Sequence, residues 1–320
     1  MKINLVKTIG ILLLAFSTAA FSAPNKNESK KRVGVSQVKK ETRKKQVKPV
    51  VKKKSLVKKS KQKSTRLVKT SKPLNYSSNN IKYSVFNYHN GTVLEENHSS
   101  VIWPIASLTK LMTAYIFVNN VPNIKDCNTT ITLADTDTLK GTRTKLATNK
   151  PYNCEKLLQV MLIASDNYAA SALARSVPGW TKSDFIRSMN EQARKWGLDD
   201  TRFVDSSGLS PHNKSSVDDY RILTTNVVKD SIVSDISSQE SIVAENKWSK
   251  SITYRNSNKL VREHGLLANL SKTGYIRESG YNLVHLANCS TPIGVVEFGA
   301  RSSEQRANFV KQKLAKYGCS

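Results

Sequence analysis

The sequence predicts an α+β fold: an antiparallel sheet that carries the last helix on one face, with a helical region inserted between its strands. Strand-like segments occur at both ends of the folded part of the chain, at residues 81–97 and 266–300. Helical patterns fill the middle. Strands that open and close a chain in this way can join in one sheet, and the helices between them then form an insertion.

The first 23 residues have the organisation of a signal peptide. Lys2 and Lys7 precede an apolar run from Ile9 to Phe16, and a small-residue cleavage site ends at Ala23. The apolar run is too short to span a bilayer comfortably. We therefore expect export to the periplasm with cleavage after Ala23, and no transmembrane span in the mature chain.

Residues 24–74 are expected to form a disordered, lysine-rich linker. They include 17 lysines and 3 arginines against two glutamates, and so hold most of the net charge of +27. The segment has almost no aromatic residues and no amphipathic period, so it cannot bury enough apolar surface to offset the entropy of ordering. In an exported protein, this charge favours anionic envelope polymers rather than nucleic acid as partners. A tether without a specific ligand is the alternative.

The folded domain is expected to span residues 75–320 and to open with a hairpin. Two strand-like runs flank Asn90-Gly91, which is a strong turn signal. A helix is predicted next, from about Ser107 to Asn120.

The inserted helical region is expected at about residues 120–215. The segment "CEKLLQVMLIASDNYAASALARSV" has helical character on both sides of Ser165. A further helix is predicted from a cap at Ser183 to a stop at Gly197. The remaining strands follow, and a final helix at about residues 302–317 closes the chain.

The four cysteines are expected to form two disulfides in an oxidising compartment. The strand that ends at Cys289 turns back through the next strand, and the last helix turns back again. Roughly 9 residues of strand at ~3.3 Å each match roughly 16 residues of helix at ~1.5 Å each, which returns the end of the helix to Cys289. We therefore predict the pair Cys289–Cys319, and Cys127–Cys154 by elimination.

Three short motifs occur in one order along the chain: Ser107-Leu108-Thr109-Lys110, Ser165-Asp166-Asn167 and Lys272-Thr273-Gly274. Each alone is a weak signal, because such short patterns arise by chance. Their order and spacing together are typical of serine acyl-transferases that act on D-alanyl peptides or β-lactams.

The predicted catalytic residues are Ser107, Lys110 and Ser165. A serine hydroxyl is a poor nucleophile and needs a base, and Lys110 lies one helical turn from Ser107. Burial among apolar neighbours favours a neutral Lys110, and so does a second cation, for which Lys272 is the candidate. Ser165 is expected to relay a proton to the leaving amine.

The predicted substrate-binding residues are Asn167, Lys272, Thr273, Gly274 and Tyr275. Asn167 is expected to hold the substrate amide. The strand of Lys272 offers its edge to an extended peptide, with Thr273 at the substrate carboxylate and Gly274 allowing close approach. The amide of Tyr275 completes an oxyanion hole with the amide of the nucleophilic serine.

Around these motifs the sequence resembles the low-molecular-mass penicillin-binding proteins of the D-alanyl-D-alanine carboxypeptidase/endopeptidase family. The likeness covers roughly residues 80–300 and includes "NGTVLEEN", "WPIASLTKLMTAY", "LLQVMLIASDNYAASALA", "MNEQARKWGLDDTRFVDSSGLSPHN" and "SKTGY". It is most similar to the periplasmic murein DD-endopeptidase branch, because the β-rich domain and amphipathic anchor of the membrane-attached carboxypeptidases do not follow the last helix.

The resemblance implies a serine β-lactamase/DD-peptidase-like α/β (α+β) fold with a five-stranded antiparallel sheet. It implies cleavage of D-alanyl bonds in peptidoglycan peptides through an acyl-enzyme on Ser107, with β-lactams as covalent inhibitors and without a metal or cofactor. The five histidines are scattered and match no metal-ligand spacing.

Two other functions are weighed against this one. A serine β-lactamase shares the three motifs, but the best-known class also carries an E-x-x-L-N element, where this chain reads "LDDTRFVDSSG". A catalytically inactive peptidoglycan-binding protein would not need the serine, both lysines and Asn167. The balance between endopeptidase and carboxypeptidase activity is left open.

Overall fold

The computed structural model describes residues 81–132, 134–135, 142–263 and 266–319. All of them belong to the second of two compact units, residues 70–320. The predicted signal peptide and basic linker, residues 1–74, lie outside the described residues.

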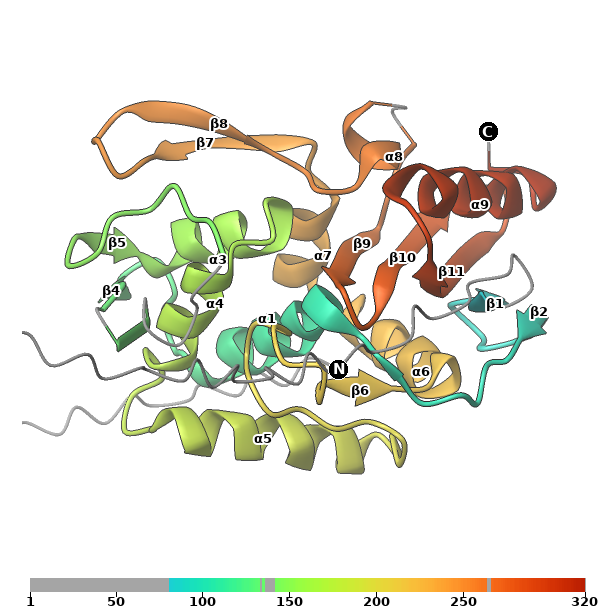
Figure 1. Ribbon diagram of the computed structural model, residues 1–320, viewed down its shortest axis with the longest axis horizontal. Helices are drawn as coiled ribbons and strands as arrows, with labels where there is room; N and C mark the ends of the chain where they lie inside the picture. The colour runs from blue at the N-terminus through green and yellow to red at the C-terminus, as the bar shows by residue number, and fades with distance from the viewer. Residues whose placement is uncertain (1–80, 133, 136–141, 264–265, 320) are drawn as a thin grey trace, which may run out of the picture. The chain divides into compact units, whose positions relative to one another are not determined.

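A five-stranded antiparallel sheet forms one part of the domain, as the sequence predicted (Figure 1). Its strands follow the order β2-β1-β11-β10-β9. Their bounds are Lys82–Asn87 (β1), Val93–Asn97 (β2), Leu270–Ile276 (β9), Gly280–Asn288 (β10) and Pro292–Ala300 (β11). The first and last strands of the chain thus pair in the middle of the sheet, and β9 lies at an edge.

The predicted hairpin is confirmed. β1 and β2 pair on either side of a turn in which Gly91 has a φ of 78°, a left-handed conformation that glycine adopts without a steric cost.

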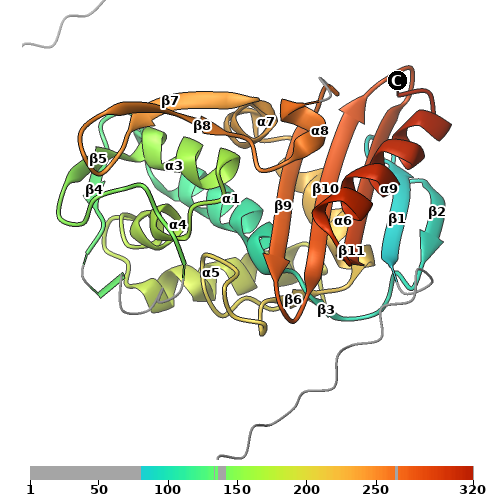
Figure 2. The ribbon, with the colours of Figure 1, turned by 45° about the horizontal axis from the view of Figure 1, so that its top comes forward.

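Helices make up much of the rest of the described domain; most of them lie beside β9, and they continue past residue 215 (Figure 2). They are η2 (Ala106–Thr109), α1 (Lys110–Asn120), α3 (Cys154–Ile163), α4 (Asn167–Ala174), α5 (Lys182–Lys195), α6 (Val217–Val227), α7 (Ser231–Ser238) and α8 (Lys259–Arg262). Short strands pair between them: β3 (Trp103–Pro104) with β6 (Lys214–Ser215), β4 (Asn128–Thr130) with β5 (Pro151–Asn153), and β7 (Ser241–Glu245) with β8 (Ser251–Arg255).

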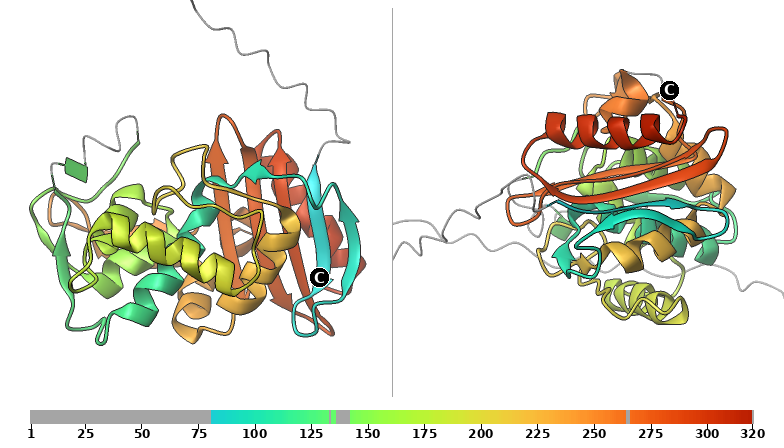
Figure 3. Two further views of the ribbon diagram at one scale, coloured as in Figure 1. Left: turned by 90° about the horizontal axis from the view of Figure 1, so that it is seen from below. Right: turned by 90° about the vertical axis from the view of Figure 1, so that its right-hand side faces the viewer.

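The sheet is covered on both faces. The last helix, α9 (Ser303–Lys316), packs on one face and α6 on the other (Figure 3). β11 supplies both cores by alternation, since Val295 joins the cluster under α9 while Val296 and Phe298 join the larger cluster that continues into the helical region. Because the larger core is shared, the helices at the β9 edge pack directly against the sheet.

Two further predictions have clear outcomes. Both disulfides are confirmed, Cys127–Cys154 with a Cα–Cα distance of 5.3 Å and Cys289–Cys319 with 5.2 Å. The predicted helix cap at Ser183 is wrong.

The cap of α5 is Thr181, two residues earlier. Its hydroxyl accepts from the amide of Asp184, and the Asp184 carboxylate accepts from the amide of Thr181. This reciprocal pair satisfies two amide groups at once, which a cap at Ser183 would not do.

None of the helices in the described ranges has the length and apolar character needed to cross a membrane.

Candidate active site

Ser107 lies on the 3₁₀ turn η2, directly ahead of α1. The hydroxyl of Tyr220, a buried residue of α6, donates to the carbonyl of Leu108 at 2.7 Å and thereby fixes the turn against α6. Ala106 has a φ of 50°, which is costly for a residue with a side chain. Such strain persists only where the surroundings impose it, and it is concentrated at functional sites.

Lys110 is fully buried, and its Nζ has three hydrogen-bond partners. They are Ser107 Oγ at 2.9 Å, Asn167 Oδ1 at 2.6 Å and the Ser207 carbonyl at 2.5 Å. An amide oxygen and a carbonyl can only accept, so they require two N–H groups from the lysine. A neutral amine has two N–H groups and one lone pair, and its lone pair then faces Ser107, the one partner with a proton to give.

The protonation of Lys110 is balanced near neutrality. Burial lowers its pKa from the usual value to about 7, while the carboxylates of Asp205 and Asp166 oppose this shift. Charged and neutral forms therefore coexist at pH 7.

A second cluster lies around Lys272 on β9. Lys272 Nζ donates to Ser165 Oγ at 2.8 Å and to the Thr273 carbonyl at 3.0 Å. The Thr273 hydroxyl donates to Ser257 Oγ at 2.6 Å. Ser165 has a φ of 62°, so a second left-handed residue lies at the site. Among the described residues, the Ser165 hydroxyl accepts a hydrogen bond from Lys272. Lys110 donates to Asn167 Oδ1 rather than to Ser165.

Positive charge is crowded here. Burial lowers the pKa of Lys272 well below its usual value, and the neighbouring charges of Lys110 and Arg306 lower it further. The sequence predicts a charged Lys272 as the partner of Lys110, whereas this environment disfavours the charge on both lysines. Arg306, from the first turn of α9, was not predicted, because a basic residue in a surface-type helix carries no motif.

Two glycines let the backbone close around the nucleophile. A methyl group added at Gly208 would lie 1.8 Å from the carbonyl oxygen of Ala106, and one added at Gly274 would lie 2.7 Å from that of Ile105. The K-T-G motif predicts that Gly274 allows close approach of the substrate. The structure shows that Gly274 is also required for β9 to pack against the turn of Ser107.

Tyr275 follows Gly274 on β9 and is 53% exposed. Its ring packs against Tyr281 of β10, with centroids 4.3 Å apart.

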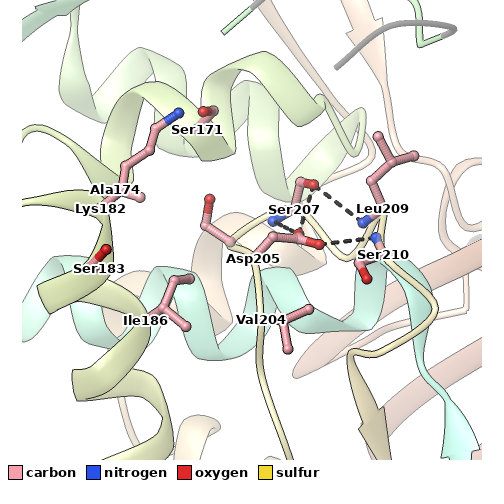
Figure 4. Close-up of a pocket in the computed structure, with 11 residues that line it drawn as sticks. Ser171, Ala174, Lys182, Ser183, Ile186, Val204, Asp205, Ser207, Leu209 and Ser210 are labelled. Atoms are coloured by element: carbon pink, nitrogen blue, oxygen red, sulfur yellow. Dashed lines mark hydrogen bonds between the residues drawn. The ribbon is translucent and has the colours of Figure 1, made fainter. Parts of the chain in front are cut away.

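The loop that supplies the Ser207 carbonyl is organised by Asp205 (Figure 4). Its carboxylate accepts from the amides of Ser207, Gly208 and Ser210. Burial alone would raise the pKa of Asp205, but these hydrogen bonds outweigh burial and lower it. An ionised Asp205 therefore fixes the loop so that the Ser207 carbonyl faces Lys110. This contact could not be predicted from the sequence, because a backbone carbonyl can be supplied by any residue type.

A cavity of about 610 Å³ opens on the other side of the same loop, between α4 and α5 (Figure 4). Its walls include Ser171, Lys182, Ile186 and Leu209, and none of the motif residues is among the described side chains that line it.

Across the described residues, no three His, Cys, Asp or Glu side chains are grouped in a way that could hold a metal ion.

The geometry agrees with a match to known sequences. A model of the D-alanyl-D-alanine carboxypeptidase family matches residues 67–301. The chain belongs to this family. It is a serine-type D-alanyl-D-alanine peptidase, and the resemblance noted from its motifs is confirmed.

Relatives in this family include both endopeptidases and carboxypeptidases. The chain is 44% identical over 241 residues to a D-alanyl-D-alanine endopeptidase of Haemophilus influenzae, covering 74% of this chain and 82% of that protein. It is 31% identical to an endopeptidase of Escherichia coli over 60% of this chain, and spans 62% of that protein's length. A carboxypeptidase of Haemophilus influenzae is 26% identical over 67% of this chain and 55% of its own length.

Solved structures show the same fold. A variant of a Streptomyces DD-transpeptidase superposes with a TM-score of 0.65 at 25% identity, over 74% of this chain and 96% of that one. A penicillin-binding protein of Listeria monocytogenes in its cefotaxime-bound form gives a TM-score of 0.64 at 25% identity, over 78% and 100% of the two chains.

Proposed function

We propose that this peptidase cleaves D-alanyl bonds in cross-linked peptidoglycan peptides, with Ser107 as nucleophile and neutral Lys110 as its general base. One observation carries the assignment: the Nζ of Lys110 has two partners that can only accept, and Ser107 Oγ is the third. In the neutral form of Lys110, the lone pair on Nζ is therefore directed at the serine proton.

Acylation follows from this geometry. Ser107 Oγ attacks the D-alanyl carbonyl carbon while its proton passes to Lys110 Nζ. The C–N bond then breaks, and the leaving amine takes a proton from the Ser165 hydroxyl, which lies 2.8 Å from Lys272 Nζ and is reprotonated from it. Lys110 then loses to solvent the proton that it took from Ser107, and Lys272 regains one. Water attacks the ester carbonyl and gives a proton to the neutral Lys110, which passes it to Ser107 Oγ as the ester C–O bond breaks and the peptide acid is released.

The substrate peptide is proposed to bind along β9, the edge strand of the sheet. An edge strand has main-chain groups that an extended peptide can pair with. The amide of Tyr275 on this strand, together with that of Ser107, is placed to stabilise the oxyanion. Asn167 Oδ1 accepts a hydrogen bond from Lys110 Nζ, so the NH₂ group of Asn167 is left to donate to a substrate carbonyl.

A substrate carboxylate is proposed to bind at Thr273, next to Lys272 and within the positive field to which Lys110 and Arg306 contribute. These neighbouring cations lower the pKa of Lys272. An anion bound here would reverse that effect and restore the charge on Lys272. With the carboxylate bound, Lys272 would hold the proton that Ser165 passes to the leaving amine.

The 44% identical relative, named as an endopeptidase, supports cross-linked peptides as the substrate class. The cefotaxime-bound neighbour supports β-lactams as covalent inhibitors. Export to the periplasm is proposed from the N-terminal pattern, and the charge of the basic linker supports retention at anionic envelope polymers.

Digestion of purified muropeptides tests this function. Cross-linked dimers and pentapeptide monomers are incubated separately with the full mature chain and with its Ser107→Ala variant, and the products are identified by mass. We expect dimers to be split into monomers by the parent chain alone. Loss of D-alanine from monomers with intact dimers would make the protein a carboxypeptidase, and rapid turnover of a chromogenic cephalosporin would make it a β-lactamase.

A further inference from the structure

An exposed tryptophan lies at the tip of the β7–β8 hairpin. Trp248 is 67% exposed, whereas Trp103, Trp180 and Trp196 are all partly buried against the core. The hairpin extends away from the sheet, over α3 and β5 (Figure 1). Because the Trp248 ring contributes little to the core, the fold itself does not account for an aromatic side chain at this position.

Lysines surround this tryptophan. Lys145, Lys247 and Lys250 are exposed, and Lys247 Nζ lies 4.5 Å from the centre of the Trp248 ring. Lys150 also lies here and pairs with Glu245. In the part of the chain that the structure describes, the other three lysines have no carboxylate within ion-pairing distance. We call Trp248, Lys145, Lys247 and Lys250 the hairpin-tip surface.

This surface is linked to the candidate active site by two hydrogen bonds. The amide of Lys247 donates to the carbonyl of Lys145 at 2.5 Å. The preceding residue, Thr144, donates through its hydroxyl to Asp166 at 2.7 Å. Asp166 stands between Ser165 and Asn167 in the second motif. Two hydrogen bonds and two steps along the chain thus connect the hairpin-tip surface to Ser165 and Asn167.

The base of the β7–β8 hairpin also contacts the candidate active site. β8 leads from the tip to Ser257, which accepts from the hydroxyl of Thr273. The base of the hairpin is thus in direct contact with β9, the strand along which the substrate peptide is proposed to bind.

Resting on the proposed function, we infer that the hairpin-tip surface is a secondary binding site for the peptidoglycan strand whose peptide is being cut. The indole face stacks on the C–H face of a sugar ring, and the lysines pair with free carboxylates of neighbouring stem peptides. The three unpaired lysines complement that polymer in charge. An anionic membrane would be complemented too, but a single aromatic side chain on a narrow hairpin suits a strand better than a surface.

Binding to insoluble sacculi tests this inference. The full mature chain is used in a Ser107→Ala background, so that the polymer is not digested and the basic linker is the same in every variant. We expect Trp248→Ala and the double change Lys247→Gln/Lys250→Gln each to weaken binding at least fivefold. Val243→Ala, which removes another exposed side chain of the same hairpin, and Lys195→Gln/Lys311→Gln, which removes equal charge elsewhere, serve as matched controls.

Intrinsic fluorescence gives a second readout that the basic linker does not affect. Soluble disaccharide-peptide fragments should alter the emission of the Ser107→Ala chain, and this change should be absent when Trp248 is also replaced. Binding of Trp248→Ala within twofold of its parent, or a fluorescence change that survives the replacement, would overturn the inference. So would an equal loss of binding to anionic lipid vesicles in the lysine variant.

Failure of the proposed function would look different. It would show as absent penicillin labelling and absent muropeptide cleavage in the parent chain with Ser107 intact. The inference predicts that both are retained, within twofold, when Trp248 alone is changed.

Discussion

Lys110 is a buried amine whose charge is set by opposing influences. Burial lowers its pKa to about 7, and Asp205 and Asp166 limit that decrease by their negative charge. The spacing of Ser107 and Lys110 could be predicted from the sequence, because a helix brings residues three apart onto one face. The contact from Ser207 could not, because it comes from a backbone carbonyl that any residue type could supply.

The rate of penicillin acylation should therefore rise with pH through about pH 7 and level off above it. The rate rises with pH because Lys110 acts as a base only when neutral, and a lysine is neutral above its pKa. Asp166→Asn keeps the helix cap but removes a carboxylate that raises the pKa of Lys110, so the midpoint should move to lower pH. Stopped-flow measurement across pH 5–9 checks this, with the exposed Asp199→Asn as control; an unmoved midpoint would contradict the electrostatic account.

The turn that carries Ser107 is packed closely between a loop and a strand. The loop of Gly208 and the strand of Gly274 both contact the turn that carries Ser107, at distances that leave no room for a side chain. K-T-G could be recognised in the sequence because its residue types are part of a motif. Gly208 and Ser257 could not be singled out, because their roles arise from contacts between distant loops.

Gly208→Ala should uncouple the loop from the turn. Its φ of 80° alone costs an alanine roughly 1–3 kcal/mol, and the new methyl group would also displace the carbonyl of Ala106. Gly179→Ala is the matched control, because Gly179 has a φ of 76° and open space around it. We expect similar backbone strain in both variants, and a fall in acylation rate of at least tenfold in Gly208→Ala only. Equal rates in the two variants would show that the packing at Gly208 is unimportant.

In the described part of the chain, helices cover both faces of the sheet, and the C-terminal helix α9 covers one unusual group. Glu297 of β11 is fully buried, and neither carboxylate oxygen has a hydrogen-bond partner among the described residues. Burial raises its pKa well above the usual value, although Arg306 opposes this. Folded protein therefore holds a proton on Glu297 that unfolded protein releases at lower pH.

This buried acid should make the fold less stable as pH rises. A pKa raised by folding contributes stability that is present below the unfolded value and is lost as pH rises through the folded value. Glu297→Gln removes the titration, so its advantage in urea unfolding should grow from pH 5 to pH 8, reaching about 1 kcal/mol or more. A difference between the two proteins that stays constant over this range would refute the assignment.

The antiparallel sheet and the disulfides could be predicted from the pattern of the chain, because strand and helix lengths restrict where the ends of elements meet. The helices after residue 215 and the exposed hairpin could not, because the segments that form them carry no motif and only weak periodicity. Much of the site thus depends on residues that become neighbours only in the folded molecule.

The most direct test measures the second-order rate of penicillin acylation and locates the adduct by peptide mass. The account predicts a single adduct on Ser107 in the parent chain. It predicts acylation slowed by at least about 100-fold in Lys110→Met, because a thioether cannot take the proton of Ser107. An adduct on another residue, or a Lys110→Met variant that is acylated at the parental rate, would contradict it.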